Sequence, residues 1–177
     1  MELNSSVQIR LAEQSDAKKI AVLLKTVYIQ TYGTEGVTDE YANFVEEEFS
    51  IEKISNKINQ DNGFYLLATS NNHVLGVAEI LWDMLNPFNS KKLPELSKLY
   101  VLEAFGRQKI GTKLLEGIER ILQMKSAESY WLCVWALNPN AIQFYEKMGF
   151  KNQGIIPFQM ETNCYENLVM TKKLQPL

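Results

Sequence analysis

The 177-residue sequence is poor in the residues that most metal and nucleophile sites require. It contains one histidine and two cysteines, which argues against a histidine-rich metal site and against a Ser-His-Asp triad. His73 follows two asparagines in an expected hairpin turn, where we expect it to be exposed. Cys133 and Cys164 lack CxxC or Cys/His spacing, and Cys133 lies in an apolar run typical of a buried thiol. We therefore expect no bound metal.

Two further absences concern positive charge and long apolar runs. Lysine and arginine total 18 against 21 acidic residues, for a net charge of −3, so the sequence lacks the basic stripe that binds nucleic acid. No run approaches the roughly 18 consecutive apolar residues of a membrane span, and the N-terminus lacks the basic-then-apolar pattern of a signal peptide. The sequence thus predicts one cytoplasmic domain over residues 1–177, with neither nucleic-acid nor membrane partners.

Hydrophobic spacing predicts an α/β protein. The first helix is expected to begin after a cap at Ser15 or Asp16 and to end at Tyr32. Further helices are expected at 38–49, 51–60, 110–126 and 139–148. Strands are expected at 8–11, 64–69, 74–82, 96–101, 130–135, 150–158 and 165–174, with a proline-punctuated loop at 84–94. The order strand, long helix, strand over 96–135 predicts two parallel neighbouring strands, a βαβ unit.

The stretch LYVLEAFGRQKIGTKLL, residues 99–115, is a strand, a polar turn and an amphipathic helix. The turn at 106–112 carries two glycines and two cations where the helix begins. Free backbone N–H groups and the helix dipole favour an anion at such a point. We interpret the turn as a pyrophosphate site; the alternative is an ordinary helix start with solvated cations.

A second motif follows the apolar strand WLCVW. Residues 138–150, NPNAIQFYEKMGF, carry every fixed position of the pattern N-x-x-A-x-x-F-Y-x-x-x-G-F. With the first motif and the element order, this pattern resembles the GNAT superfamily of N-acetyltransferases. The run WLCVWALNPNAIQFYEKMGF is most similar to bacterial spermine/spermidine N-acetyltransferases. The resemblance implies a mostly antiparallel mixed sheet of about seven strands, a central parallel βαβ unit and helices on both faces.

The resemblance also implies acetyl-CoA as co-substrate. In the superfamily, the strand before the turn diverges from its parallel neighbour and pairs with the pantetheine arm. The turn departs from the family pattern, because Gly106 replaces a Gln or Arg and Lys109 replaces the first glycine. The sequence therefore does not determine the backbone conformation at Lys109. The implied cofactor-binding residues are Leu99, Tyr100, Val101, Arg107, Gln108, Lys109, Ile110, Gly111, Thr112, Asn138, Asn140, Phe144 and Lys147.

Acetyl transfer needs an acid for the departing thiolate and a route for the amine's proton. Tyr145 matches the family's general acid; the alternative is that its ring merely packs beside Phe144. Some relatives carry a glutamate as base at the position of Cys133, so this chain lacks it. Glu79 and Glu95 are the remaining candidates, and a chain of waters is the other route.

Aromatic residues and an acidic segment are the features of the sequence that bear on the acceptor amine. By the resemblance, Tyr28, Tyr32, Tyr41, Trp82 and Phe158 are candidates to line its pocket, although such aromatics are also typical of a core. Residues 39–52 hold six acidic side chains, which form either a solvated helix face or a surface that attracts a cationic amine. We expect a polyamine-like acceptor; the alternatives are a protein N-terminus or lysine, and a non-catalytic acyl-CoA-binding module. The final strand pair often serves as a dimer surface in this superfamily, which implies a homodimer.

Overall fold

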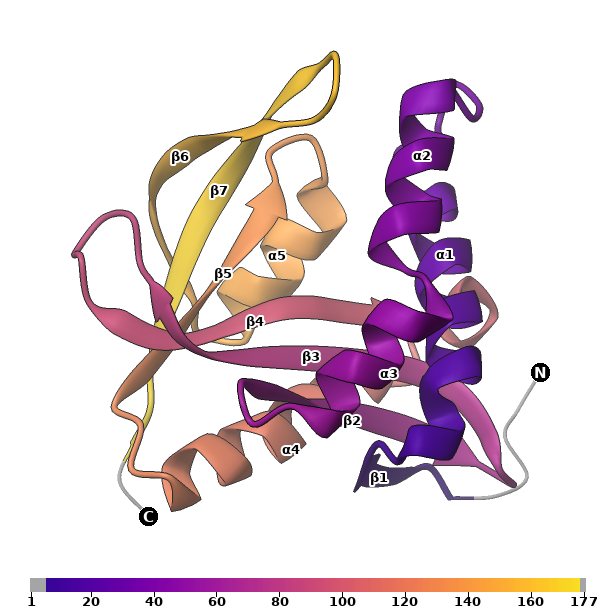
Figure 1. The fold of residues 1–177 in the computed structure, drawn as a ribbon. Helices are drawn as coiled ribbons and strands as arrows, with labels where there is room; N and C mark the ends of the chain where they lie inside the picture. The colour runs from indigo at the N-terminus through magenta and orange to yellow at the C-terminus, as the bar shows by residue number, and fades with distance from the viewer. Residues whose placement is uncertain (1–5, 176–177) are drawn as a thin grey trace. The chain divides into compact units, whose positions relative to one another are not determined.

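The computed structural model describes residues 6–175. Its elements are β1 (Gln8–Leu11), η1 (Gln14–Asp16), α1 (Ala17–Tyr32), α2 (Asp39–Glu48), α3 (Ile51–Asn59), β2 (Gly63–Ser70), β3 (His73–Leu85), β4 (Lys92–Val101), η2 (Glu103–Phe105), α4 (Ile110–Met124), β5 (Ser129–Trp135), α5 (Pro139–Lys147), β6 (Lys151–Gln159) and β7 (Cys164–Lys173). The strands form a seven-stranded sheet in the order β1-β2-β3-β4-β5-β7-β6, with β4 parallel to β5 (Figure 1). The predicted α/β fold class is confirmed. Within the described residues, no helix has the length and apolarity needed to cross a membrane.

The expected loop at 84–94 is shorter in the structure, because β3 continues to Leu85 and β4 begins at Lys92, which leaves residues 86–91 outside the strands. The side chain of Asn86 closes the short turn that remains, since its Oδ1 accepts the backbone N–H of Phe88 at 2.9 Å. Pro94 lies within β4, where its fixed φ is compatible with extended backbone. Pro87 lies in the turn, so only Pro94 departs from the expected loop.

The start of α1 also differs from the prediction. Asp16 occupies the cap position, but its carboxylate does not cap α1. It accepts the backbone N–H of Glu13 at 3.0 Å and pairs with Arg10 at 2.7 Å. The hydrogen bond from Arg10 holds the pKa of Asp16 well below its usual range. Asp16 thus links the turn before α1 to Arg10 of β1.

Contacts along the chain define two compact units. Unit 1 comprises residues 1–79 and 98–118, and unit 2 comprises residues 80–97 and 119–177. The division falls inside β3, β4 and α4, each of which is one continuous element. A single domain over residues 1–177 stays a prediction.

In unit 1, α1, α2 and α3 share a hydrophobic core with β2 and β3. Tyr28 lies inside this core with 7% of its surface exposed. Its ring centroid is 4.5 Å from that of Tyr32 and 5.1 Å from that of Phe44, and it meets Tyr41 edge-on at 6.4 Å. Aromatic packing therefore joins α1 to α2.

In unit 2, β7 is antiparallel to both β5 and β6, and β4 pairs with β5 through Glu95 and Trp131. So short a parallel pairing is expected for strands that diverge. On one sheet face, Tyr130 of β5 and Lys172 of β7 both bind Glu119 of α4. Trp131 and Thr171, one position along each strand, therefore lie on the opposite face.

Candidate active site

The turn between β4 and α4 has the backbone geometry of a glycine-rich loop, even though Lys109 replaces the expected glycine. Arg107 and Lys109 have φ values of 62° and 58°, in the left-handed region that favours glycine. Ile110 is buried and begins α4, and the N–H of Lys113 donates to the Lys109 carbonyl at 3.0 Å. The N–H groups of this first turn have no partner within the helix. The turn therefore offers backbone donors and two exposed cations to an anion.

The free energy of unfolding of the Lys109→Gly variant is expected to be about 1 kcal/mol higher than that of Lys109→Ala. Alanine keeps the strain of the left-handed backbone, whereas glycine relieves it. Both variants remove the same charge, so their difference isolates the backbone. Urea denaturation of the two variants measures it. A glycine variant no more stable than the alanine variant would contradict a left-handed backbone at this position.

The predicted pantetheine strand, Leu99–Val101, is the end of β4 and lies in unit 1. Gly76 of β3 lets this strand approach closely, since a Cβ there would lie 3.0 Å from the carbonyl oxygen of Tyr100. The Tyr100 side chain is hydrogen-bonded to Tyr32. Burial raises the pKa of the Tyr32 phenol, and this hydrogen bond acts in the opposite direction. Unit 1 thus brings the predicted cofactor strand to the last turn of α1.

Unit 2 holds the second motif, on α5. The predicted cap is confirmed, since Asn138 Oδ1 accepts the N–H of Ala141 at 3.1 Å and Pro139 opens the helix. Tyr145 is 9% exposed, and its ring centroid lies 5.3 Å from that of Phe144 and 5.5 Å from that of Phe150. The ring therefore has the packing role considered above, and the role of its hydroxyl stays a prediction.

The other α5 candidates, Asn140 and Lys147, are exposed. Together with Phe144 they lie in unit 2, whereas the turn at 106–112 lies in unit 1. Their contact with acetyl-CoA stays a prediction.

Glu79 lies in a buried ionic cluster of unit 1 and is 1% exposed. Its carboxylate accepts hydrogen bonds from Lys57 at 2.9 Å, Lys98 at 2.6 Å and the Tyr65 hydroxyl at 2.6 Å. Burial alone would raise the pKa of Glu79, but Lys98 and Lys57 outweigh it and lower that pKa to about 2. A carboxylate so acidic and so fully bonded is a poor proton acceptor near neutral pH. This environment disfavours Glu79 as the general base.

Two of the six acidic side chains at 39–52 form ion pairs with lysines. Glu46 pairs with Lys25 at 2.8 Å. Glu48 is bound by lysines from α3 and β4, with Lys98 at 3.2 Å. The lysines that bind Glu48 and Glu79 include Lys98, which lies far from both in the sequence, so no local pattern predicts these pairs. These pairs weaken the electrostatic argument for a polycationic acceptor.

Glu95 has a different setting, in unit 2. It is half-buried and is the register partner of Trp131. Cys133, two positions further on β5, is half-buried rather than buried as expected. Burial, with a smaller contribution from the charge of Glu95, raises the pKa of the Cys133 thiol to about 12. The thiol of Cys133 is therefore neutral and feels the charge of a carboxylate on the neighbouring strand.

The aromatic candidates divide between the units. Tyr28, Tyr32 and Tyr41 come together in unit 1, where Tyr28 is a core residue and the other two are half-buried. Trp82 and Phe158 lie in unit 2, and Phe158 is 37% exposed. The structure thus supports the core interpretation for Tyr28 and leaves the other four as candidates.

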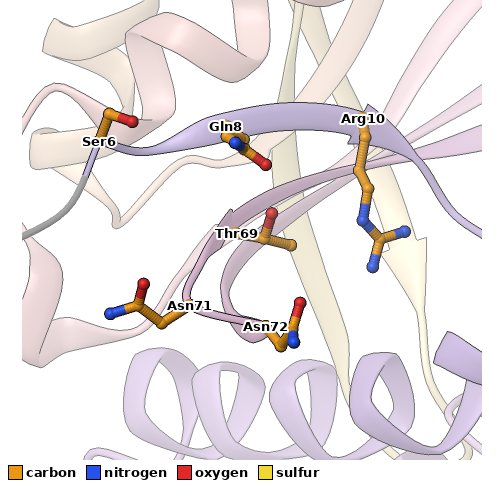
Figure 2. Close-up of a pocket in the computed structure, with 6 residues that line it drawn as sticks. All are labelled: Ser6, Gln8, Arg10, Thr69, Asn71 and Asn72. Carbon is orange, nitrogen blue, oxygen red and sulfur yellow. The ribbon is translucent and has the colours of Figure 1, made fainter.

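A separate cavity of about 340 Å³ lies where β1 pairs with β2 in unit 1 (Figure 2). Six polar residues line it: Ser6, Gln8, Arg10, Thr69, Asn71 and Asn72. Arg10 is the charged residue among them, and its two terminal nitrogens already bond the Asp16 carboxylate at 2.7 and 3.0 Å. The cavity contains none of the predicted site residues.

Solved structures define the class of fold. The chain is similar to the PaiA N-acetyltransferase of Thermoplasma acidophilum, solved in complex with coenzyme A, with a TM-score of 0.78 and 23% identity over 95% of this chain and 99% of that one. It is also similar to a ribosomal-protein-alanine N-acetyltransferase of Brucella melitensis, with a TM-score of 0.72 and 21% identity over 94% of this chain and 99% of that one. The fold is that of the N-acetyltransferases.

Sequence comparison identifies the family. The profile of the Acetyltransferase (GNAT) family matches residues 30–150, more than half of the chain. An uncharacterized N-acetyltransferase encoded in the pepI 3′ region of Lactobacillus delbrueckii subsp. lactis is 23% identical over 148 residues, covering 82% of this chain and 84% of that protein. The chain belongs to the GNAT acetyltransferase family, and it is an acetyl-CoA-dependent N-acetyltransferase.

Proposed function

We propose that this enzyme acetylates a small polycationic primary amine of the spermidine or spermine type. The resemblance of residues 131–150 to bacterial spermine/spermidine N-acetyltransferases supports this acceptor. Tyr32 and Tyr41, half-buried at the edge of the unit 1 core, add aromatic faces on which a cationic amine is stabilised. Trp82 and Phe158 are further candidates to line its pocket.

A homodimer through β6 and β7 is supported by the exposure of Ile155 on β6.

The turn at 106–112 binds the pyrophosphate of acetyl-CoA in this proposal, and Leu99–Val101 pairs with its pantetheine arm. The left-handed backbone at Lys109 supports the first part, because it preserves a glycine-loop conformation in front of a helix N-terminus. Lys109 then adds a cation where the family has only backbone. Asn138, Asn140, Phe144 and Lys147 make the remaining cofactor contacts.

Glu95 is the general base of the proposed mechanism, and Tyr145 is the general acid. The position of Glu95 is the main support for this assignment, because Glu95 lies on the strand next to Cys133, the position at which some relatives carry a glutamate by the resemblance described above. The ionic cluster around Glu79 disfavours the competing candidate. A carboxylate on the neighbouring strand thus takes the place of the missing residue.

Glu95→Gln is expected to lower kcat by about 10²-fold or more, because glutamine keeps the shape but cannot accept the amine's proton. Initial rates of thiol release from acetyl-CoA, followed across pH, measure the loss. Glu128→Gln is the matched control, since Glu128 is an exposed carboxylate of the same unit. If Glu95→Gln retains the wild-type kcat, Glu95 is not the base.

A protein N-terminus is the second candidate acceptor. The pairing of Glu46 and Glu48 with lysines favours it, because these carboxylates no longer select for a polycation. The similar Brucella melitensis structure, a ribosomal-protein-alanine N-acetyltransferase, adds support. Comparison of kcat/KM for spermidine, a monoamine, a peptide with a free N-terminal alanine and the same peptide blocked at its N-terminus distinguishes the acceptors. The proposal predicts the highest value for spermidine.

A further inference from the structure

Trp131 Nε1 and Thr171 Oγ1 are buried and lack a hydrogen-bond partner within residues 6–175. Trp131 is 5% exposed, and its indole N–H can only donate, whereas the Thr171 hydroxyl can donate or accept. A buried polar atom without a hydrogen-bond partner destabilises the folded state. Two such atoms therefore need an explanation.

The sheet register places the residues that carry these atoms next to the proposed base. Trp131 of β5 is the partner of Glu95 on β4 and of Thr171 on β7. Directly opposed residues project from the same face, with Cβ atoms about 4.5–5.5 Å apart across an antiparallel pair. Glu95, Trp131 and Thr171 thus form a row on one face, within unit 2. A donor, a donor–acceptor and a carboxylate together can bind one small polar molecule.

We propose that Trp131 and Thr171 are positioning residues that hold a water beside Glu95, and that this water carries the acceptor amine's proton to the carboxylate. This inference rests on the proposed function, since it gives Glu95 its route to the amine. A buried water typically makes two to four hydrogen bonds, and these three side chains supply that number. The water satisfies the indole N–H and the threonine hydroxyl and turns its lone pair toward the amine.

The proton balance is complete. The acceptor ammonium gives one proton through the water to Glu95, which releases it to solvent after turnover. The C–N bond forms and the C–S bond breaks, and the thiolate takes a proton from Tyr145. The proton that the nitrogen then loses as the amide forms balances the reprotonation of Tyr145.

Four other titratable groups lie on this face of the registered strands, namely Cys133, Lys151, Tyr165 and Lys173. Cys133 follows Trp131 on β5, and its raised thiol pKa of about 12 keeps it neutral. Lys173 follows Thr171 on β7, and Lys151 pairs with Thr171 from β6. A shift in the pH profile on removing the water's ligands therefore reports on Glu95.

Thr171→Val and Trp131→Phe test the inference: the first keeps the approximate shape and removes a single hydroxyl, whereas the second removes the indole N–H together with part of the ring. Both are expected to lower kcat about tenfold with little change in KM for acetyl-CoA. Both should raise the pKa of the acidic limb of kcat/KM, because a carboxylate that loses hydrogen bonds becomes harder to ionise. Thr171→Ser, which keeps the hydroxyl, should restore both values.

Tyr130→Phe is the matched control, because it removes a buried hydroxyl from the same strand but on the opposite face. It should lower stability without moving the acidic limb. The inference is overturned if folded Thr171→Val keeps both the kcat and the acidic limb of the wild type. It is also overturned if Thr171→Ser behaves like valine. Glu95→Gln decides separately on the base, so a failure of the water site is distinguishable from a failure of the proposed function.

Discussion

Replacing Glu79 with glutamine is expected to lower the free energy of unfolding by about 3–5 kcal/mol, because the change leaves buried cations without their counter-charge. Glu79 is 1% exposed, and the side chain of Lys98, its closest cationic partner at 2.6 Å, is 10% exposed. Glu48 also contacts Lys98, at 3.2 Å, but its own charge is shared with other lysines. Denaturant unfolding measures the loss.

Glu46→Gln is the matched control for this change. Its pair with Lys25 is of similar length, 2.8 Å, but the Glu46 side chain is 73% exposed. Exposed ion pairs contribute about 0–1 kcal/mol. Equal losses for the two variants would contradict the structural role of the buried cluster.

The same cluster predicts how stability depends on pH. The pKa of Glu79 in the folded protein is about 2, below its ordinary value of 4.5. A lowered folded-state pKa means that the stabilisation is fully present above pH 4.5 and is lost as the pH falls toward 2. The stability difference between the wild type and Glu79→Gln should therefore shrink over this window. A difference that stays constant as the pH falls would contradict the ionised state of Glu79.

Tyr145→Phe is expected to lower kcat by about 10²-fold or more while the Kd for acetyl-CoA stays unchanged, because only the proposed proton donor is removed. Phenylalanine keeps the ring that lies 5.3 Å from Phe144 and 5.5 Å from Phe150. The fold of α5 should therefore persist. Steady-state thiol release gives kcat, and titration with acetyl-CoA gives the Kd.

Tyr130→Phe controls for the loss of a buried phenol in the same unit. The Tyr130 hydroxyl donates to Glu119 at 2.6 Å, so its removal should cost stability but leave the kcat of the folded enzyme unchanged. If Tyr145→Phe also keeps the wild-type kcat, its hydroxyl has no part in the mechanism, and Tyr145 is a packing residue alone.

Local patterns were sufficient to predict most of the fold. The Asn-Pro start of α5 and the regular apolar spacing of α4 are properties of neighbouring residues, so the sequence carries them directly. The extent of the loop at 84–94 was overestimated because Pro94 lies within β4, and the turn that remains is closed by the side chain of Asn86. Local spacing cannot show such a side-chain bond.

The candidate site was less predictable because its key contacts are long-range. Lys98 and Glu48 are hydrogen-bonded although they are fifty positions apart in the sequence. The residues around Glu48 therefore contain no pattern that predicts this partner. The row of Glu95, Trp131 and Thr171 likewise depends on which strands are neighbours. The left-handed backbone at Lys109 is also invisible in the sequence, because lysine favours other conformations.

The most direct test of the proposed function is thiol release from acetyl-CoA by the wild-type enzyme with single amines. We predict saturable release with spermidine, a higher kcat/KM than with a monoamine or an N-terminal peptide, and a product acetylated at a primary amine. Release with a peptide but not with spermidine would overturn the polyamine proposal. Tight binding of acetyl-CoA without release by any amine would contradict the mechanism as a whole.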